Sequence, residues 1–201
     1  MVWGTGMLTP VRNEFLPQVT VAAVRGPLTA ALLEIAVPLG DPGLLVSDLL
    51  DSRPEPDGRI GIVLHHSQTM PADLAAAVAR DARFRVIDVA DEDHMGVVAA
   101  IAACAHVYSS SLHGLIVADA FGVPSTWLDV QGIHKSAAFK FYDYALSIGR
   151  LLNAPMPLDA ILEHAAGLPD RFETIAHLAT VGRVREGLCA AFPAEIMAQA
   201  A

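Results

Sequence analysis

Between residues 59 and 130, short apolar segments alternate with segments of helical composition, and no other feature of the sequence restricts the fold as strongly. Strands that alternate with helices in this way form right-handed βαβ units around a parallel sheet. The sequence therefore predicts an α/β fold, with a Rossmann-like parallel sheet flanked by helices. The expected strands are 59–65, 84–89, 106–108 and 125–130, and the expected helices are 71–80, 95–105 and 112–121.

The regions on either side of this core are less regular. A buried strand at 18–24 and a helix at 28–35 are expected before it. The chain beyond Lys135 is mainly helical, which predicts a helical C-terminal tail. Its expected helices lie at 137–152, 158–166, 170–180 and 182–199. The segment from Ser52 to Gly58 combines prolines, a glycine and charged residues, which indicates an exposed linker.

Composition excludes several classes of protein. The formal net charge is −9 and the pI is about 5.2, which argues against a nucleic-acid-binding protein. Cys104 and Cys189 form no CxxC pair, as is usual for thiols in a reducing compartment. The N-terminus has no signal-peptide pattern, and the longest apolar run, 97–105, is too short to span a bilayer. We therefore expect a cytoplasmic protein.

Several catalytic motifs are absent from the sequence. HExxH, GxSxG, Walker A and a well-formed GxGxxG do not occur, which excludes zinc proteases, α/β-hydrolases and P-loop NTPases in their usual forms. No metal site is predicted. His94 follows the acidic run 91–93 just before a helix, and this pattern indicates a solvated first turn.

The segment SSSLHG at 109–114 carries the strongest sign of a binding site. It joins a predicted strand to a predicted helix, at the carboxyl end of the sheet, where open α/β folds bind ligands. Free N–H groups and the dipole at a helix start favour phosphate or carboxylate. Alternatively, the serines cap the helix and the histidine makes only a structural hydrogen bond. The residues expected around the anion are Ser110, Ser111, Leu112, His113 and Gly114.

Other basic residues fall at the same predicted edge. Arg25 joins a strand to a helix and could clamp an anion, or it could form a surface ion pair. His65 and His66 close a predicted strand, so we expect one to face the pocket and the other to be structural. His134 and Lys135 follow the last predicted strand and add positive groups.

With these residues in place, the sequence resembles the polysaccharide pyruvyltransferase family, and within it the ketal pyruvyltransferases of exopolysaccharide synthesis. SLHGxIxADAxGxP is the most specific pattern. In the family's common pattern an arginine precedes Leu-His-Gly, whereas this chain has Ser111 there. The matching segments are VWGTGM (2–7), VRGPLTA (24–30), LGDPGLL (39–45), SSSLHGLIVADAFGVPS (109–125) and Lys135.

The resemblance implies a fold similar to the C-terminal half of a two-domain GT-B-type enzyme. Residues 1–57 would then be a remnant of the N-terminal domain with its linker, 58–160 the donor-binding domain, and 161–201 the C-terminal helices. The chain would thus lack most of a preceding domain. We also expect self-association, because helices after residue 150 would leave apolar surface uncovered.

The resemblance also implies the chemistry. Phosphoenolpyruvate would be the donor substrate, with no other cofactor, and a sugar with two free hydroxyls would be the acceptor. That sugar would belong to an exopolysaccharide or its lipid-linked precursor, which implies peripheral contact with a membrane-bound acceptor. The catalytic residues would be His113 and Arg25, and the donor-binding residues Ser110, Ser111, Leu112, Gly114, His65, His134 and Lys135.

Two other functions fit the same residues. One is a GT-B-like glycosyltransferase that uses a nucleotide sugar, although no Glu follows His113 at a useful distance to bind a ribose. The other is a truncated, non-catalytic remnant that binds a partner. Only the pyruvyltransferase predicts saturable binding of phosphoenolpyruvate.

Limited proteolysis tests the predicted linker. Exposed backbone is cut first, so cleavage should occur within 52–58 before any cleavage within 59–130. Mass spectrometry of the earliest fragments gives the cut sites. Early cleavage inside 59–130 would contradict the boundary.

Overall fold

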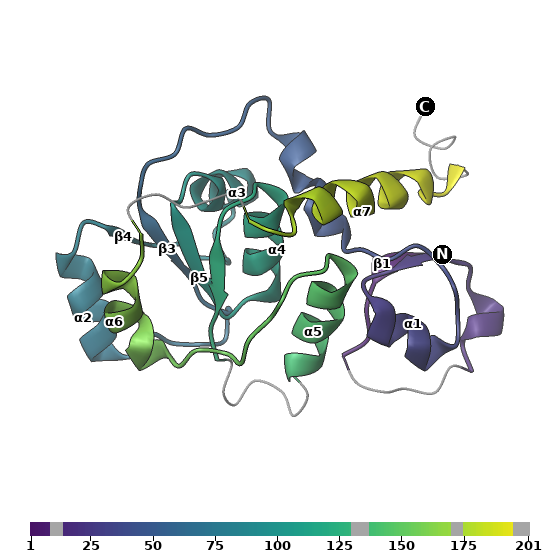
Figure 1. The fold of residues 1–201 in the computed structure, drawn as a ribbon, viewed down its shortest axis with the longest axis horizontal. Helices are drawn as coiled ribbons and strands as arrows, with labels where there is room; N and C mark the ends of the chain where they lie inside the picture. The colour runs from purple at the N-terminus through teal and green to yellow at the C-terminus, as the bar shows by residue number, and fades with distance from the viewer. Residues whose placement is uncertain (9–13, 130–136, 170–174, 195–201) are drawn as a thin grey trace.

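A computed structural model describes residues 1–8, 14–129, 137–169 and 175–194. Its main sheet has four parallel strands, as the sequence predicts, and their order is β4-β3-β5-β6 (Figure 1). The strands lie between two layers of helices, and every residue of the two central strands is buried, as in parallel sheets that are covered on both sides. The strands are β3 (Ile60–Val63), β4 (Phe84–Val86), β5 (His106–Ser109) and β6 (Ser125–Trp127).

Helices cover both faces of this sheet, and each face has its own hydrophobic cluster. Successive strand residues point to opposite faces, so Tyr108 joins one cluster and Val107 the other. On one face lie α2 (Ala72–Arg80), α6 (Ile161–Ala166) and the short η3 (Leu158–Ala160). On the other lie α3 (His94–Ala102), α4 (Leu112–Ala120), α5 (Ala137–Ser147) and α7 (Leu178–Ala190).

The first fifty residues form a smaller unit beside the main sheet. Its two parallel strands, β1 and β2, pair with each other, so the opening strand finds its partner later in the chain. Gly43 packs against Ile116 of α4 and attaches the unit to the main domain. The elements of the unit are β1 (Val2–Thr5), η1 (Leu16–Gln18), β2 (Val21–Val24), α1 (Pro27–Leu33) and η2 (Pro42–Leu49).

A buried ion pair joins this unit to α5. Asp143 is fully buried, and its carboxylate accepts hydrogen bonds from Arg25 Nε at 3.2 Å and from the hydroxyl of Thr29 at 2.6 Å. The backbone N–H of Thr29 donates to the same carboxylate at 2.9 Å. Between Arg25 and α1 lies Gly26, where a Cβ would sit 1.9 Å from the Asp143 carbonyl oxygen. The segment RGP therefore brings α1 and α5 into backbone contact.

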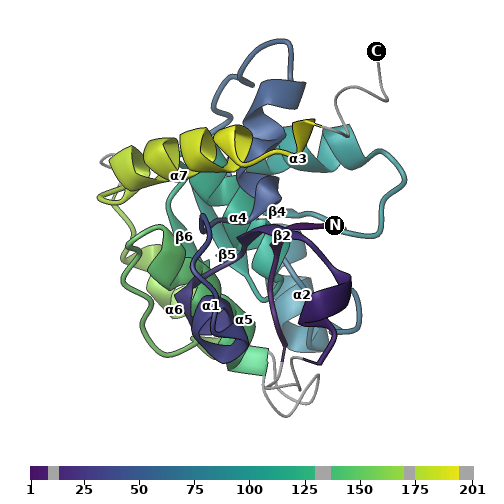
Figure 2. The ribbon, with the colours of Figure 1, turned by 90° about the vertical axis from the view of Figure 1, so that its right-hand side faces the viewer.

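The helix α7 ties the start of the chain to the main domain. The Trp3 indole N–H donates to the Leu188 carbonyl at 2.9 Å, and its ring lies 4.8 Å from the Phe192 ring. Gly40 lies against Val184 and Leu188 of the same helix. Figure 2 shows α7 crossing above the first unit and α4.

Several boundaries differ from those that the sequence predicts. The strand β3 ends at Val63. Beyond it, the backbone N–H of His65 donates to the side-chain hydroxyl of Ser110 and not to a neighbouring strand. The helix α5 ends at Ser147, and Gly149 follows with φ +67°. The predicted helix 170–180 is wrong at 175–177, which precede α7, while 170–174 lie outside the described residues. Residues 52–58 are mostly exposed and carry no helix or strand, but the three-part domain division stays a prediction.

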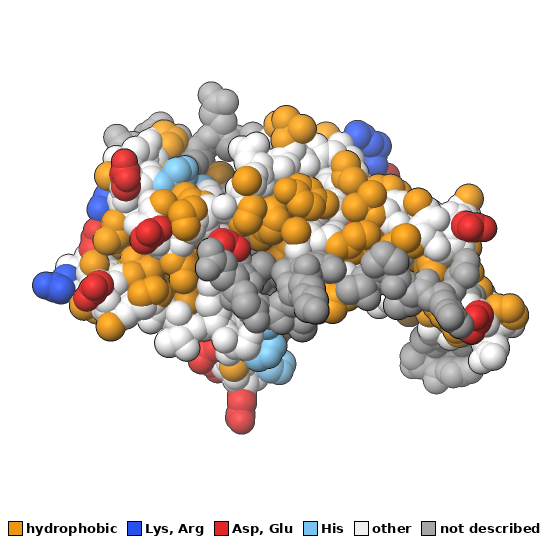
Figure 3. Space-filling view, turned by 90° about the horizontal axis from the view of Figure 1, so that it is seen from below, with side chains coloured by type: hydrophobic (Ala, Val, Ile, Leu, Met, Phe, Trp, Pro, Cys, Tyr) orange, Lys and Arg blue, Asp and Glu red, His pale blue; other side chains and the backbone are white. Residues whose placement is uncertain are grey.

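Apolar side chains are spread over the side of the molecule on which α5 and α6 lie (Figure 3). The exposed fraction is 55% for Leu146 of α5 and 95% for Leu151 beyond it. This surface is what the expected self-association requires, and self-association stays a prediction. Within the described ranges, no helix is long and apolar enough to cross a membrane.

Two glycine substitutions test the contact between α1 and α5. Gly26→Ala should lower the free energy of unfolding by about 2 kcal/mol or more, because backbone atoms occupy the space of the new methyl group. Gly182→Ala in α7 is the control, since no described atom lies within 4 Å of its Cβ position. It should stabilise the helix by about 0.5–1 kcal/mol. If both substitutions change the free energy of unfolding in urea equally, the close packing at Gly26 is contradicted.

Candidate functional site

A cavity of about 780 Å³ lies at the carboxyl ends of β3, β4 and β5. The chain runs from β3 outward to β4 and then returns to β5 on the other side, so a topological switch point lies between β3 and β5. Ligands of open α/β sheets bind at such points. The lining residues are Arg25, His65, His66, Val89, Ala90, His94, Val97, Val98, Ile101, Ser111, Leu112, His113, Gly114, Val117 and Lys140.

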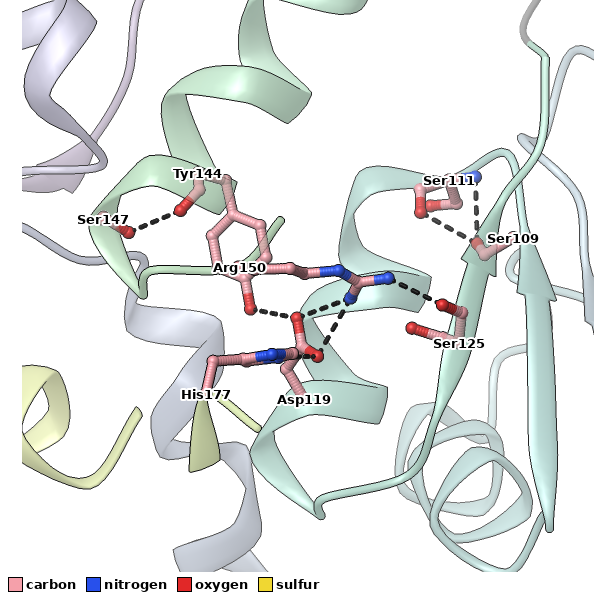
Figure 4. A network of polar contacts seen from close by, with 8 residues as sticks. All are labelled: Ser109, Ser111, Asp119, Ser125, Tyr144, Ser147, Arg150 and His177. Carbon is pink, nitrogen blue, oxygen red and sulfur yellow. Dashed lines mark hydrogen bonds and ion pairs between the residues drawn. The ribbon is translucent and has the colours of Figure 1, made fainter. Parts of the chain in front are cut away.

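Ser109 shapes the start of α4 at the bottom of this cavity. Its hydroxyl donates to the Val63 or Ser111 carbonyl, at 3.0 and 2.9 Å, and accepts from the Ser111 N–H at 3.1 Å (Figure 4). A Cβ on Gly114 would sit 2.2 Å from this hydroxyl oxygen, so the glycine is required by internal packing. Ser111 precedes the helix, but its side chain makes no capping hydrogen bond and lies in the cavity wall.

Ser110, the remaining serine of the motif, is not among the lining residues. It is fully buried, and its hydroxyl accepts the His65 N–H at 2.9 Å. Its own N–H donates to the Val63 carbonyl. The geometry therefore gives Ser110 a supporting position between β5 and the segment after β3.

His113 is exposed in the first turn of α4, beside η2. Its Cδ2 lies 3.8 Å from the position of a Cβ on Gly43, whose N–H donates to the buried carboxylate of Asp41. Burial raises the pKa of Asp41, while the Gly43 hydrogen bond and the charges of His113 and Arg25 oppose that rise. The sequence argument did not single out Asp41, although it lies in the segment LGDPGLL.

Arg25 lines the cavity, but much of its guanidinium is already paired. Besides the contacts with Asp143, its Nη2 donates to the Met7 carbonyl at 2.7 Å. The alternative of an ion pair therefore holds for Arg25, with the difference that the pair is buried and not on the surface. Much of the charge of Arg25 is balanced before any ligand enters.

Two polar lining residues were not assigned to the site from the sequence: His94 and Lys140. Lys140 precedes Asp143 by three positions on α5, a spacing that places both on one helix face, and this was the available signal. Burial, and next the charge of Arg25, lower the pKa of Lys140. His94 is exposed, as the predicted solvated turn requires, and it also lines the cavity.

His65 and His66 both line the cavity, so the expectation that only one would face it is wrong. The strand has ended at Val63, and strict alternation no longer applies. The two rings lie 4.2 Å apart, and the Ser67 N–H donates to His65 Nδ1 at 3.3 Å.

The predicted residues His134 and Lys135 lie outside the described residues, and their roles stay predictions. Among the described side chains, no group of three or more His, Cys, Asp or Glu could hold a metal ion.

A second buried carboxylate fixes α4 behind the site. Asp119 accepts hydrogen bonds from the Tyr144 hydroxyl at 2.9 Å, from Arg150 Nη1 at 2.8 Å and from His177 Nε2 at 2.8 Å (Figure 4). Burial and the nearby Asp119 charge raise the pKa of Tyr144 well above its usual value. The network links α4 to α5 and to the segment that leads into α7.

Together, the fold and the site define an α/β protein with a basic cavity at the carboxyl edge of its sheet. The sequence model of the family "Polysaccharide pyruvyl transferase" matches residues 3–132, more than half of the chain. The chain belongs to this family, and the resemblance predicted from the motifs is confirmed.

Two relatives support this assignment. The "Uncharacterized protein L143" of Acanthamoeba polyphaga mimivirus is 30% identical over 159 residues, which cover 74% of this chain and 55% of that protein. The "Succinoglycan biosynthesis protein ExoV" of Rhizobium meliloti (strain 1021) is 35% identical over 135 residues, or 64% of this chain and 40% of that protein. The chain thus spans about half the length of these curated relatives. No solved structure matches it significantly, so the GT-B-type architecture stays a prediction.

His113→Ala should reduce anion binding more than stability. A hydrogen bond to a charged group contributes about 1.5–3 kcal/mol, so affinity for phosphoenolpyruvate should fall about ten- to a hundredfold. Paired calorimetric titrations and thermal melts measure both quantities.

His164→Ala provides the opposite control. His164 lies outside the cavity and bonds the Tyr108 hydroxyl at 2.7 Å, so its loss should lower the melting temperature and leave affinity unchanged. The assignment of His113 is wrong if His113→Ala shows this second pattern.

Proposed function

We propose that this chain takes part in pyruvyl transfer from phosphoenolpyruvate to a sugar of a bacterial exopolysaccharide or its lipid-linked precursor, forming a pyruvate ketal. The observation that carries the proposal is the basic cavity at the start of α4, within the segment that the family model matches. Phosphoenolpyruvate serves as donor substrate, and no separate cofactor is proposed.

The charges around the cavity suit a small, highly charged anion. The protein as a whole has a formal net charge of −9, yet the described lining of the cavity includes Arg25, Lys140 and four histidines and no carboxylate. Such a local excess of positive groups attracts an anion that the rest of the surface repels. Because Asp143 balances much of Arg25, we assign the direct ion pair with the donor to Lys140.

The start of α4 supplies the remaining contacts. The Ser111 hydroxyl lies in the wall without a capping role, and the first N–H groups of the helix lie beside it. These groups suit phosphate or carboxylate oxygens. Ser111 thus offers a hydroxyl where the family's common pattern has a guanidinium, which makes Lys140 the more important cation.

The transfer needs two additions to one carbon. His113 gives a proton to the methylene carbon of the donor, and the positive charge develops on the carbon that bears carboxylate and phosphate. A sugar hydroxyl adds to that carbon and loses its proton. Phosphate then leaves with the electrons of its C–O bond, and a second hydroxyl of the same sugar adds, loses its proton and closes the ketal ring.

The biological setting extends this proposal. The relative from Rhizobium meliloti is named for succinoglycan biosynthesis, and we infer a comparable polysaccharide role for this chain. A lipid-linked acceptor would require peripheral contact with a membrane from a cytoplasmic location. A homo-oligomer is proposed on the exposed apolar surface around α5, and no nucleic-acid partner is proposed.

Calorimetry with phosphoenolpyruvate tests the donor assignment. We expect saturable binding, weaker binding of inorganic phosphate, and none of a nucleotide sugar. Lys140→Gln should weaken donor affinity about tenfold, as expected for a lost charge-assisted contact, and Lys140→Arg should restore part of it.

Arg185→Gln is the control for a lost positive charge, because Arg185 pairs with Asp48 on the exposed part of η2 and lies outside the cavity. It should bind the donor as the unchanged chain does. If the chain binds the nucleotide sugar more tightly than phosphoenolpyruvate, the glycosyltransferase is favoured. If it binds neither ligand, the non-catalytic remnant is favoured.

A further inference from the structure

The cavity is larger than the proposed donor requires. Pockets of roughly 300–1,000 Å³ hold drug-sized ligands, and this cavity has about 780 Å³. Phosphoenolpyruvate is a three-carbon molecule, so it fills only part of that volume. Room remains for a second substrate in the same cavity.

The walls of the cavity differ in chemistry. Arg25 and Lys140 come from the first unit and from α5. The wall that α3 contributes has no Lys or Arg among its described lining residues and consists of His94, Val97, Val98 and Ile101. An apolar wall with a single imidazole suits the C–H face and a hydroxyl of a sugar ring better than it suits a phosphate.

The hydrogen bond of His94 assigns its tautomer. Its Nδ1 lies 3.0 Å from the Asp91 carbonyl oxygen, which can only accept, so Nδ1 carries the proton. In the neutral ring, Nε2 is then the nitrogen with the free electron pair. The Asp93 carboxylate accepts the Gly96 N–H at 2.9 Å and caps α3, which fixes the turn that presents His94 to the cavity.

The ring of His65 gives no such assignment. Its Nδ1 accepts the Ser67 N–H at 3.3 Å but lies closer to the Ser67 hydroxyl, at 2.9 Å, which can donate or accept. His113 is assigned as the proton donor to the methylene carbon. Of these three histidines, His94 is the one whose Nδ1 bonds to an atom that can only accept, which leaves its Nε2 to take a proton.

We propose that the α3 wall is the acceptor subsite and that His94 is the catalytic base which deprotonates the sugar hydroxyls; this rests on the pyruvyl transfer proposed above. Nε2 of His94 takes the hydroxyl proton as the sugar oxygen forms its bond to the donor carbon. The proton given to the methylene carbon by His113 is thus matched by the one that His94 removes. His94 then passes its proton to the leaving phosphate, which frees Nε2 to take the proton of the second hydroxyl as that oxygen adds to the donor carbon.

The first test separates acceptor chemistry from donor binding. In His94→Ala, ketal formation on methyl glucopyranoside, followed by proton NMR, should fall about a hundredfold or more. Affinity for phosphoenolpyruvate should stay within about twofold, and added imidazole should restore part of the rate, which a structural role would not allow. Glu92→Gln, an exposed neighbour outside the cavity wall, is the control and should keep the full rate.

The second test determines the tautomer of His94 and does not require the enzyme to catalyse the reaction. Nitrogen-15 NMR of the histidine side chains should show His94 protonated on Nδ1, and a proton on Nε2 of the neutral ring would overturn the assignment. An unchanged rate in His94→Ala, or donor affinity that falls in step with the rate, overturns it as well. If the unchanged chain does not bind phosphoenolpyruvate, the proposed function itself fails; if it binds and turns over, only the role of His94 is in question.

Discussion

The carboxylate of Asp143 is the contact on which the geometry of the site depends. It lies on α5 and accepts hydrogen bonds from Arg25 and from the N–H and hydroxyl of Thr29. These bonds fix α5 against the first unit. The position of α5 sets where Lys140 enters the cavity. Removal of one partner from such a buried pair leaves an uncompensated charge, which costs about 3–5 kcal/mol. This interaction therefore helps to join the first unit to the main domain and also positions the basic wall of the site.

The same interaction changes the role of Arg25. A guanidinium already engaged by a carboxylate contributes less to an incoming anion than its position in the cavity wall suggests. In the proposed function, the direct contacts with the donor therefore fall to Lys140 and to the helix start at Ser111. Arg25 is then better described as the residue that connects the donor site to the rest of the fold.

Much of the fold follows from the sequence, because strand and helix patterns of residues 59–130 are local and strongly apolar. The cavity edge was also predictable, since parallel strands bring His65, Ser111 and His113 to one side of the sheet. What pattern reasoning could not supply was pairing over long distances. Asp143 lies 118 positions from Arg25, and nothing local marks either as the other's partner. His94 was not assigned to the site for another reason: its turn is solvated, as predicted, and only the fold shows that the turn borders the cavity.

The contact between Trp3 and Leu188 has a consequence for the order in which the molecule is built. These residues are 185 positions apart, so the small sheet gains its last support only when nearly the whole described chain is available. Closing so long a loop is slow compared with forming local βαβ units. During synthesis the main sheet can assemble before α7 is available to cover β1 and β2. Because the cavity takes Arg25 from this unit, its basic wall is complete only when the unit has docked on α5.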